Sequence, residues 1–294
     1  MLVIKDLTKT YSSGVRALRG VSLELPPGVF GLLGPNGSGK TTLMKIVATL
    51  LEPDSGSIEM NGADLLRRKD QTRQMLGYLP QDFGLYPTLT ARQMLDYFAK
   101  LKGISNKSER NALIDALLER VNLSQEPTQP LGEFSGGMRQ RLGIAQALIG
   151  EPKLIIVDEP TAGLDPQERV RFHNLISETA GENTVVILST HIVSDVSNLC
   201  SRMAIIQKGT ILSSCTPREA VEQLKDSVWE ATVPRENLPV FKSRFKVISS
   251  RMFDGQARLR VISKGQHPSE EFTQATPILE DYYLDFVNRQ DLQN

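Results

Sequence analysis

The first part of the chain has the polar and apolar alternation of antiparallel strands. Residues 1–10 and 15–25 alternate in this way, which predicts two strands with one buried face each. Residues 57–65 predict a hairpin that turns at Asn61-Gly62, a dipeptide that accepts positive φ. We therefore expect an antiparallel β subdomain at the N-terminal end.

Three continuous apolar runs, at 29–33, 154–158 and 185–189, have the length of buried strands. Each run is followed by a turn and then by a helical pattern, and residues 43–51 repeat apolar positions at helical spacing after the first of them. Strands that alternate with helices are typical of a mainly parallel sheet. The pattern predicts an α/β core.

Helical periodicity returns over a long stretch, from Thr90 to Gly150, with apolar residues three and four positions apart. We expect this stretch to form a helical subdomain, at about 88–150, inserted into a main domain of residues 1–216.

The last part of the chain predicts a small α+β module over residues 217–294. A helical pattern at 217–226 precedes a stretch that looks rich in strands at 228–264, and residues 278–290 predict a closing helix. The module could strengthen a dimer, contact a partner, regulate turnover or simply pack on the main domain, and the residues leave these alternatives open.

Composition narrows the class of partner. Lysine plus arginine and aspartate plus glutamate both number 34, and the pI is near 6.9, so the chain lacks the basic excess of a dedicated nucleic-acid binder. No apolar run approaches the roughly 20 residues that span a bilayer, and no secretory h-region is visible. We expect a cytoplasmic chain. Cys200 and Cys215 show no metal-ligand spacing, so neither zinc nor a disulfide is predicted.

Residues 34–41 read GPNGSGKT and match the phosphate-binding pattern G-x-x-x-x-G-K-[ST]. The segment lies between a predicted buried strand and a predicted helix, which is the context that this loop requires. Its backbone N–H groups wrap around phosphate, Lys40 reaches the terminal phosphates, and Thr41 can ligate Mg²⁺. The segment predicts a nucleoside triphosphate site.

A second acidic strand end supplies candidate metal and base groups. In LIIVDEP the apolar run leads to Asp158 at the carboxyl end of the strand, where open α/β sheets bind ligands. Adjacent side chains on an extended strand point to opposite sides. We therefore expect Asp158 to hold Mg²⁺, directly or through water, and Glu159 to accept a proton from the attacking water.

Together with the phosphate loop, an ordered set of motifs across residues 1–215 resembles the ABC transporter ATPase family. These motifs are Gln81 in YLPQD, Phe134-Ser135-Gly136-Gly137-Met138, LIIVDEP, Ala162-Gly163-Leu164-Asp165 and His191 in LSTHIV. The FSGGM segment is what narrows the P-loop superfamily to this family. The resemblance implies a P-loop NTPase core with a mainly parallel sheet, the N-terminal antiparallel β subdomain, the helical insertion and the small C-terminal module.

The FSGGM segment also has a local interpretation. Ser135 suits a helix N-cap, and Gly136 and Gly137 leave backbone N–H groups uncovered, which predicts either an ordinary capped helix or a second anion-binding helix start. The resemblance implies that it contacts the γ-phosphate bound to a second copy, so that ATP is held between two chains. Phe134 and Met138 replace the usual leucine and glutamine; because the serine and both glycines remain, we expect hydrolysis to persist.

The resemblance implies roles for further residues. It places His191 against the γ-phosphate and the attacking water, Gln81 at Mg²⁺ or that water, and Tyr11 against adenine; a half-buried loop residue is the less favoured alternative for Tyr11. Asp165 begins a helix by local rules and lines the dimer seam by resemblance. The predicted catalytic residues are Glu159, His191 and Lys40. The predicted nucleotide-binding residues are Tyr11, Gly34, Pro35, Asn36, Gly37, Ser38, Gly39, Lys40, Thr41, Thr42, Gln81, Ser135, Gly136 and Gly137. The predicted Mg²⁺ ligands are Thr41, Gln81 and Asp158.

These inferences lead to one main functional hypothesis. We expect the ATP-binding subunit of an ABC transporter, most similar to bacterial ABC-2-type exporter ATPases, that works as a homodimer on a separate transmembrane permease at the inner face of the membrane. An ABC ATPase that acts on ribosomes or DNA is the alternative, but the chain has neither a basic stripe nor a heptad array. A small-molecule kinase or GTPase would leave FSGGM, Asp165 and His191 unexplained.

Overall fold

The computed structural model describes residues 1–125, 128–265 and 267–291, without the side chains of 289–291. The chain divides into two compact units, Met1–Ser214 and Cys215–Asn294, and the last three residues of the expected C-terminal module lie outside the described part. The expected boundary at 216–217 lies next to this division. Each unit is described by itself.

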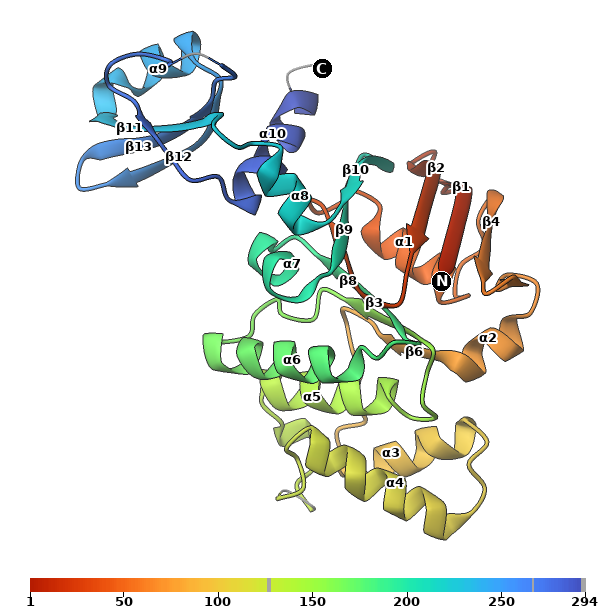
Figure 1. Cartoon of the computed structure of the whole chain (residues 1–294). Coiled ribbons are helices and arrows are strands. Elements are labelled where there is room, and N and C mark those ends of the chain that lie inside the picture. Colours follow the sequence, from red (N-terminus) through yellow and green to blue (C-terminus); the bar gives the residue numbers. More distant parts are fainter. Residues whose placement is uncertain (126–127, 266, 292–294) are drawn as a thin grey trace. The chain divides into compact units, whose positions relative to one another are not determined.

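An antiparallel sheet opens the first unit (Figure 1). Its strand order is β2-β1-β4-β5, with bounds Leu2–Thr10 for β1, Arg16–Leu25 for β2, Ser55–Met60 for β4 and Ala63–Asp64 for β5. Asn61 and Gly62 form the turn between β4 and β5 with φ values of 50° and 80°. The predicted strands and hairpin are confirmed.

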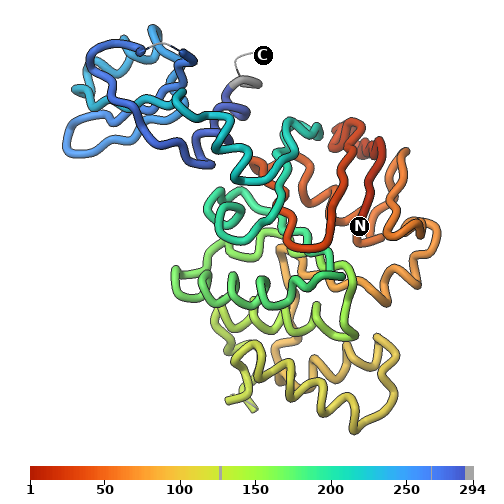
Figure 2. Tube along the Cα trace, viewed as in Figure 1, coloured from red at the N-terminus to blue at the C-terminus, as the bar shows by residue number. Residues whose placement is uncertain are grey.

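The central sheet has the order β10-β9-β3-β8-β7-β6. Its bounds are Gly28–Leu33 for β3, Leu76–Leu79 for β6, Leu154–Asp158 for β7, Val185–Thr190 for β8, Arg202–Gln207 for β9 and Thr210–Cys215 for β10. The β3, β6, β7, β8 and β9 pairings are parallel. The three predicted apolar runs are therefore the neighbouring strands β3, β8 and β7, which Figure 2 shows side by side although they are far apart in sequence. The mainly parallel sheet is confirmed.

Helix α1 (Lys40–Val47) begins directly after the phosphate loop and contacts both sheets, through β2 on one side and β7 and β8 on the other. One apolar core surrounds it and includes residues of both sheets. Three further helices complete this part: α2 (Lys69–Met75), α6 (Pro166–Thr179) and α7 (Val193–Leu199). The α1 N-terminus is thus held rigidly at the carboxyl end of β3.

The predicted helical stretch contains α3 (Ala91–Leu101), α4 (Lys107–Arg120), the short 3₁₀ turn η1 (Leu131–Glu133) and α5 (Gly136–Ala147). The helices α3, α4 and α5 contact one another, and α5 also contacts β6 of the central sheet. Thr90 and Gln93 form a reciprocal capping box at the start of α3. Helix α5 consequently joins the helical insertion to the core.

The second unit is an α+β module with the sheet order β12-β13-β11-β14. Its bounds are Pro217–Glu222 for α8, Val228–Pro234 for β11, Arg235–Asn237 for η2, Leu238–Arg244 for α9, Val247–Phe253 for β12, Gln256–Ile262 for β13, Thr273–Gln274 for β14 and Leu279–Asp291 for α10. The stretch 228–264 is rich in strands, as expected, and residues 235–244 within it are helical. The reason is spacing: Leu238, Phe241 and Phe245 recur every three or four residues and pack against the module's own core.

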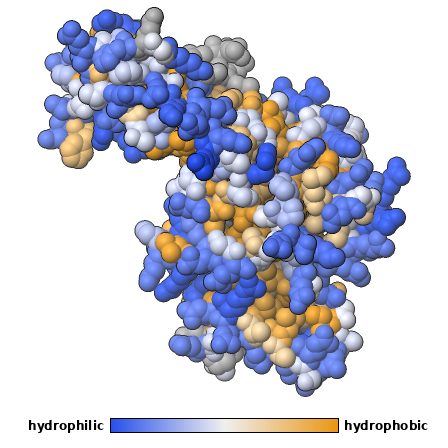
Figure 3. Space-filling model, in the orientation of Figure 1, coloured by the Kyte–Doolittle hydropathy of each residue, from blue (hydrophilic) through white to orange (hydrophobic). Residues whose placement is uncertain are grey.

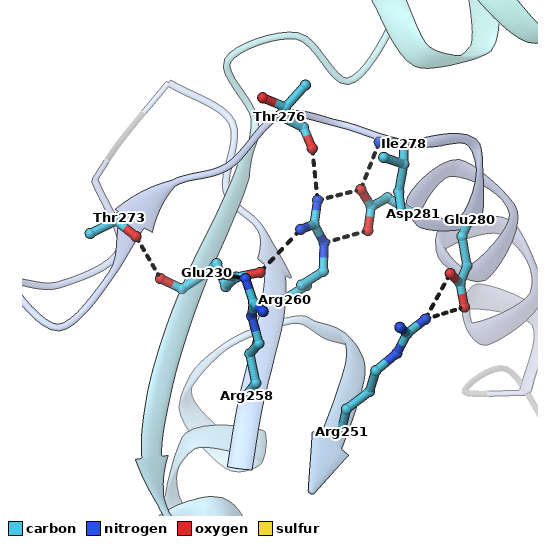
Figure 4. Close-up of polar contacts among 9 residues, drawn as sticks. All are labelled: Glu230, Arg251, Arg258, Arg260, Thr273, Thr276, Ile278, Glu280 and Asp281. Carbon is cyan, nitrogen blue, oxygen red and sulfur yellow. Dashed lines mark hydrogen bonds and ion pairs between the residues drawn. The ribbon is translucent and has the colours of Figure 1, made fainter. Parts of the chain in front are cut away.

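An ion-pair network fastens the closing helix α10 to this sheet (Figure 4). Arg260 on β13 donates to both oxygens of Asp281 at 2.8 Å and to the Thr276 carbonyl at 2.9 Å. Arg251 on β12 pairs with Glu280. Because Asp281 is almost fully buried, the Arg260 pair is the shielded one, and the exposed Arg251 pair is weaker.

Within the described part of the chain, no helix has both the length and the apolar character needed to cross a membrane.

Candidate active site

The phosphate loop leaves β3 and turns sharply into α1. Gly39 has φ 109°, and a Cβ there would lie 2.6 Å from the Ala17 carbonyl oxygen. A Cβ on Gly34 would lie 2.3 Å from the Ile206 carbonyl oxygen. Both positions thus require glycine because neighbouring backbone packs against them. The loop is held in shape by segments distant in sequence.

Lys40 points back across the loop from the first turn of α1. Its Nζ donates to the carbonyl oxygens of Gly34 at 2.8 Å and Pro35 at 3.1 Å. It also lies 3.1 Å from Glu159 Oε1, and both of these side chains are almost completely buried. The ammonium therefore stands between the phosphate loop and the predicted base.

Glu159 does not continue the strand. Its φ is 51°, in the left-handed region that non-glycine residues rarely adopt. We expected Asp158 and Glu159 to point to opposite sides because both would lie on an extended strand. That reason is wrong, because β7 ends at Asp158 and the backbone turns at Glu159. The turn brings Glu159 Oε2 to 2.6 Å from His191 Nδ1. Strained backbone of this kind is common at functional sites.

Asp158 is fully buried at the end of β7. Ser189 donates to its Oδ1 at 2.6 Å, and Oδ2 has no hydrogen-bond partner among the described residues. Burial raises the pKa of Asp158, and the nearby hydroxyls of Ser189 and Thr41 oppose that shift. A buried carboxylate oxygen without a partner, beside the Thr41 hydroxyl, fits a hard cation such as Mg²⁺.

A cavity of about 510 Å³ joins the phosphate loop to the predicted base. The predicted residues that line it are Tyr11, Asn36, Gly37, Gly39, Lys40, Thr41, Thr42, Gln81 and Glu159. Tyr11 is 38% exposed, and its hydroxyl lies 3.1 Å from Thr42 Oγ1. Gln81 thereby lies at the same cavity as Thr41 and Glu159, and Tyr11 at its rim is tied to α1.

The structure adds residues that the motifs did not indicate. Arg16, Arg19 and Lys208 line the same cavity and supply positive charge. The Gly209 N–H donates to the Ser38 carbonyl at 2.9 Å, so the β9–β10 turn closes over the phosphate loop. No local signal in the sequence could show that the Lys208-Gly209 turn folds onto a loop about 170 residues earlier.

The FSGGM segment does not face this cavity. Ser135 is the N-cap of α5 and accepts the Met138 N–H at 3.2 Å, which confirms the predicted capped helix start. Gly136 lines a different depression, of about 390 Å³, together with Gln81 and residues of the 162–164 loop. Within the described chain, the two helix starts that are predicted to bind phosphate therefore line two different depressions.

Two partner-facing motifs of the resemblance touch inside the chain. Asp165 caps α6 by accepting the Glu168 N–H at 2.8 Å, as predicted. Glu168 then pairs with Arg141 of α5 at 3.3 Å, and its carboxylate lies 2.7 Å from the place that a Cβ on Gly137 would take. Without a side chain, Gly137 lets the Glu168 carboxylate approach the first turn of α5, in addition to its predicted phosphate contact.

Comparison with known proteins identifies the family. Residues 18–162 match the family model described as ABC transporter. Nod factor export ATP-binding protein I of Burkholderia pseudomallei is 33% identical over 283 residues, which cover 93% of this chain and 92% of that protein. The chain belongs to the ABC transporter family. The ATP-binding protein NatA of Bacillus subtilis is also similar to this ABC ATPase, with 36% identity over 232 residues, 77% of this chain and 92% of NatA.

A solved ATP-binding cassette extends the likeness to structure. It is a dimer in a post-hydrolysis state with ADP and Pi bound, is 27% identical to this ABC ATPase and superposes with a TM-score of 0.67. The match covers 74% of this chain and 98% of the cassette. The P-loop NTPase fold expected from the motifs is confirmed.

Proposed function

We propose that this ABC ATPase binds ATP with Mg²⁺ in the phosphate-loop cavity, hydrolyses it between two copies of the chain and drives a separate transmembrane permease. The observation that carries the proposal is the placement of Glu159. Its carboxylate lies beside Lys40 and His191 at the mouth of a phosphate loop, where it can accept a proton from water that attacks a γ-phosphate.

The remaining side chains divide the other tasks. Lys40 and the phosphate-loop amides bind the triphosphate, and the Tyr11 ring stacks on the base. Thr41 and Asp158 hold Mg²⁺, with Gln81 at the edge of that site, and the ion would offset charge on the phosphate oxygens. His191 stabilises the transferred phosphoryl group.

A second copy completes the site. The α5 N-terminus has Ser135 as its cap and Gly136 in its first turn, and Gly136 lines a depression other than the chain's own nucleotide cavity. An anion-binding helix start with no anion site in its own chain suits the γ-phosphate of a neighbour. The dimeric cassette to which this chain is similar supports that arrangement.

A groove of about 510 Å³ between α3 and the central sheet offers a docking surface for the permease. Leu50 and Leu101 line it and are 60% and 66% exposed, and Figure 3 shows apolar residues gathered over α3. Lys102 donates to the Arg73, Gln74 and Leu76 carbonyls, which joins the end of α3 to the start of β6. Because β6 leads to Gln81, movement at the groove reaches the nucleotide cavity.

Export is the direction that the relatives support, since one of them is an export ATP-binding protein. In this proposal the chain lies at the inner face of the cell membrane through its permease, and residues 217–294 form an accessory domain. An ABC ATPase that acts on ribosomes or DNA is less consistent with the balanced charge.

Replacing the general base tests the catalytic assignment. Glu159→Gln keeps the shape of the side chain but removes its basicity, and we expect kcat for ATP hydrolysis to fall at least about 100-fold. Glu178→Gln, the same change on an exposed residue of α6, is the matched control and should hydrolyse ATP at the parent rate. A Glu159→Gln variant as active as the parent would show that another group is the base.

Placing charge in the groove tests the permease assignment. Leu101→Asp should prevent the tagged chain from co-purifying a multispanning protein from detergent-solubilised membranes, because the charge opposes apolar docking. Val170→Asp, on an exposed residue outside the groove, should leave co-purification intact. Equal recovery by both variants would exclude the groove as the docking surface.

A further inference from the structure

A fully buried carboxylate lies behind the active site, on α7. Asp195 has no exposed surface and belongs to none of the motifs described above. Its Oδ2 accepts hydrogen bonds from Thr161 Oγ1 and, at 3.4 Å, from Thr190 Oγ1. Its Oδ1 lies 3.0 Å from His173 Nε2 and 3.8 Å from Arg169 Nε, both on α6. The two oxygens therefore face different parts of the molecule.

The hydroxyls that meet Oδ2 belong to the segments that carry Glu159 and His191. Thr161 follows Glu159 by two positions in the same loop, and Thr190 directly precedes His191 at the end of β8. Thr190 Oγ1 also accepts the Ile192 N–H at 3.0 Å, so this hydroxyl connects the residue before His191 to the residue after it. Both threonines are almost fully buried. One carboxylate oxygen thus holds both catalytic segments.

A buried charge persists only where hydrogen bonds replace its hydration, and the resulting arrangement resists displacement. Movement of Asp195 would therefore shift the Thr161 loop and the end of β8 together. The distance that depends on both segments is the 2.6 Å contact between Glu159 Oε2 and His191 Nδ1.

We propose that Asp195 is a positioning residue for ATP hydrolysis, which fixes Glu159 and His191 relative to each other through the hydroxyls of Thr161 and Thr190. The proposal rests on the catalytic roles given above to Glu159 and His191. Asp195 touches neither of these side chains and acts through the backbone that carries them.

Thr190→Val and Thr190→Ser separate positioning from folding. Valine keeps the shape of threonine but removes the hydroxyl, and we expect kcat to fall about tenfold because a small misplacement of reacting groups is costly. Affinity for the fluorescent analogue mant-ATP should stay within about twofold, since the phosphate loop is untouched. Serine keeps the hydroxyl and should restore the parent kcat. Asp195→Ala removes the oxygen that accepts from both threonines and should reproduce the valine result more strongly.

His173→Phe is the matched control. It removes a partner from the same carboxylate but at Oδ1, which faces α6, and retains a ring at that position. Its kcat should stay within about twofold of the parent, even where its melting temperature falls as far as that of Thr190→Val.

The outcomes separate this inference from the proposed function. Parent kcat in Thr190→Val and in Asp195→Ala would overturn the inference. An equal loss of kcat in His173→Phe would also overturn it, because it would indicate a purely structural cluster. If Glu159→Gln and the His191→Ala variant lose hydrolysis while the Asp195 cluster variants keep it, only the positioning role fails. If Glu159→Gln keeps hydrolysis, the proposed function fails first.

Discussion

The Lys40 ammonium is shared between the phosphate loop and Glu159. Besides its two carbonyl partners, Nζ lies 3.1 Å from Glu159 Oε1, with side-chain exposures of 4% and 6%. In such a buried pair each charge depends on the other. A triphosphate offers Lys40 a second set of oxygens, and its negative charge is repelled by the Glu159 carboxylate. Nucleotide binding therefore competes with the Lys40–Glu159 pair.

This competition predicts an effect of Glu159→Gln that is independent of hydrolysis. The variant should bind the non-hydrolysable analogue AMP-PNP at least about fivefold more tightly than the parent, because the neutral amide neither holds Lys40 nor repels phosphate. Isothermal titration calorimetry measures the two affinities, with Glu178→Gln as the unchanged control. Equal affinities in parent and Glu159→Gln would mean that the ion pair does not oppose binding.

Among the elements, the sheet of the second unit depends most visibly on charge. Glu230 on β11 accepts from Arg258 and from Arg260 of the neighbouring strand β13 (Figure 4). The hydrogen bond from Arg258, with the nearby charge of Arg260, holds the pKa of Glu230 below its ordinary value of 4.5. Since the pKa is lower in the folded state, Glu230 stabilises the fold above pH 4.5. That contribution disappears as the pH falls through the folded-state pKa.

Thermal unfolding at a series of pH values, followed by Trp229 fluorescence, tests this contribution. Trp229 is the single tryptophan of the chain and precedes Glu230 on β11, so its emission reports on the second unit. The parent should melt at a higher temperature than Glu230→Gln at neutral pH, and the difference should shrink below pH 4.5. Glu236→Gln, on an exposed residue, should track the parent throughout. A difference that does not change with pH would contradict the assignment.

For the whole molecule, the decisive feature is the separation of the two helix starts that are predicted to bind phosphate. The α1 start lies at the nucleotide cavity, whereas the α5 start lies at another depression. The ion pair between Glu168 and Arg141 ties α5 to α6, the two helices that begin at the FSGGM segment and at Asp165. A dimer would then assemble each site from the rigid parts of two chains.

Ser135→Asp tests this arrangement without removing the helix cap, since aspartate caps as well as serine. In a Glu159→Gln background, ATP-dependent dimerisation should be lost because the new carboxylate repels the partner's γ-phosphate. Binding of mant-ATP to the monomer should be unchanged. Light scattering after size exclusion measures the dimer, and the neutral cap Ser135→Asn should retain it. If the Ser135→Asp variant still formed an ATP-dependent dimer, the FSGGM segment would not contact the nucleotide of the partner.

Features built from neighbouring residues could be predicted from the sequence. The strands, the turns at Asn61-Gly62 and Lys208-Gly209, the caps at Ser135 and Asp165 and the phosphate loop all follow from local patterns. The helical segment at 235–244 was not predicted as a separate element inside the strand-rich stretch. The assignments of Mg²⁺ and of catalytic roles remain predictions.

By itself the sequence determined which chemical groups are present and which short segments shape them, because caps, turns and the phosphate loop depend on contacts a few residues apart. Only the tertiary structure decided how Glu159 turns between Lys40 and His191, how the turn at Gly209 closes the phosphate loop and how Asp195 meets both catalytic segments. These contacts join residues on different elements, and their distances depend on how the sheets and helices pack.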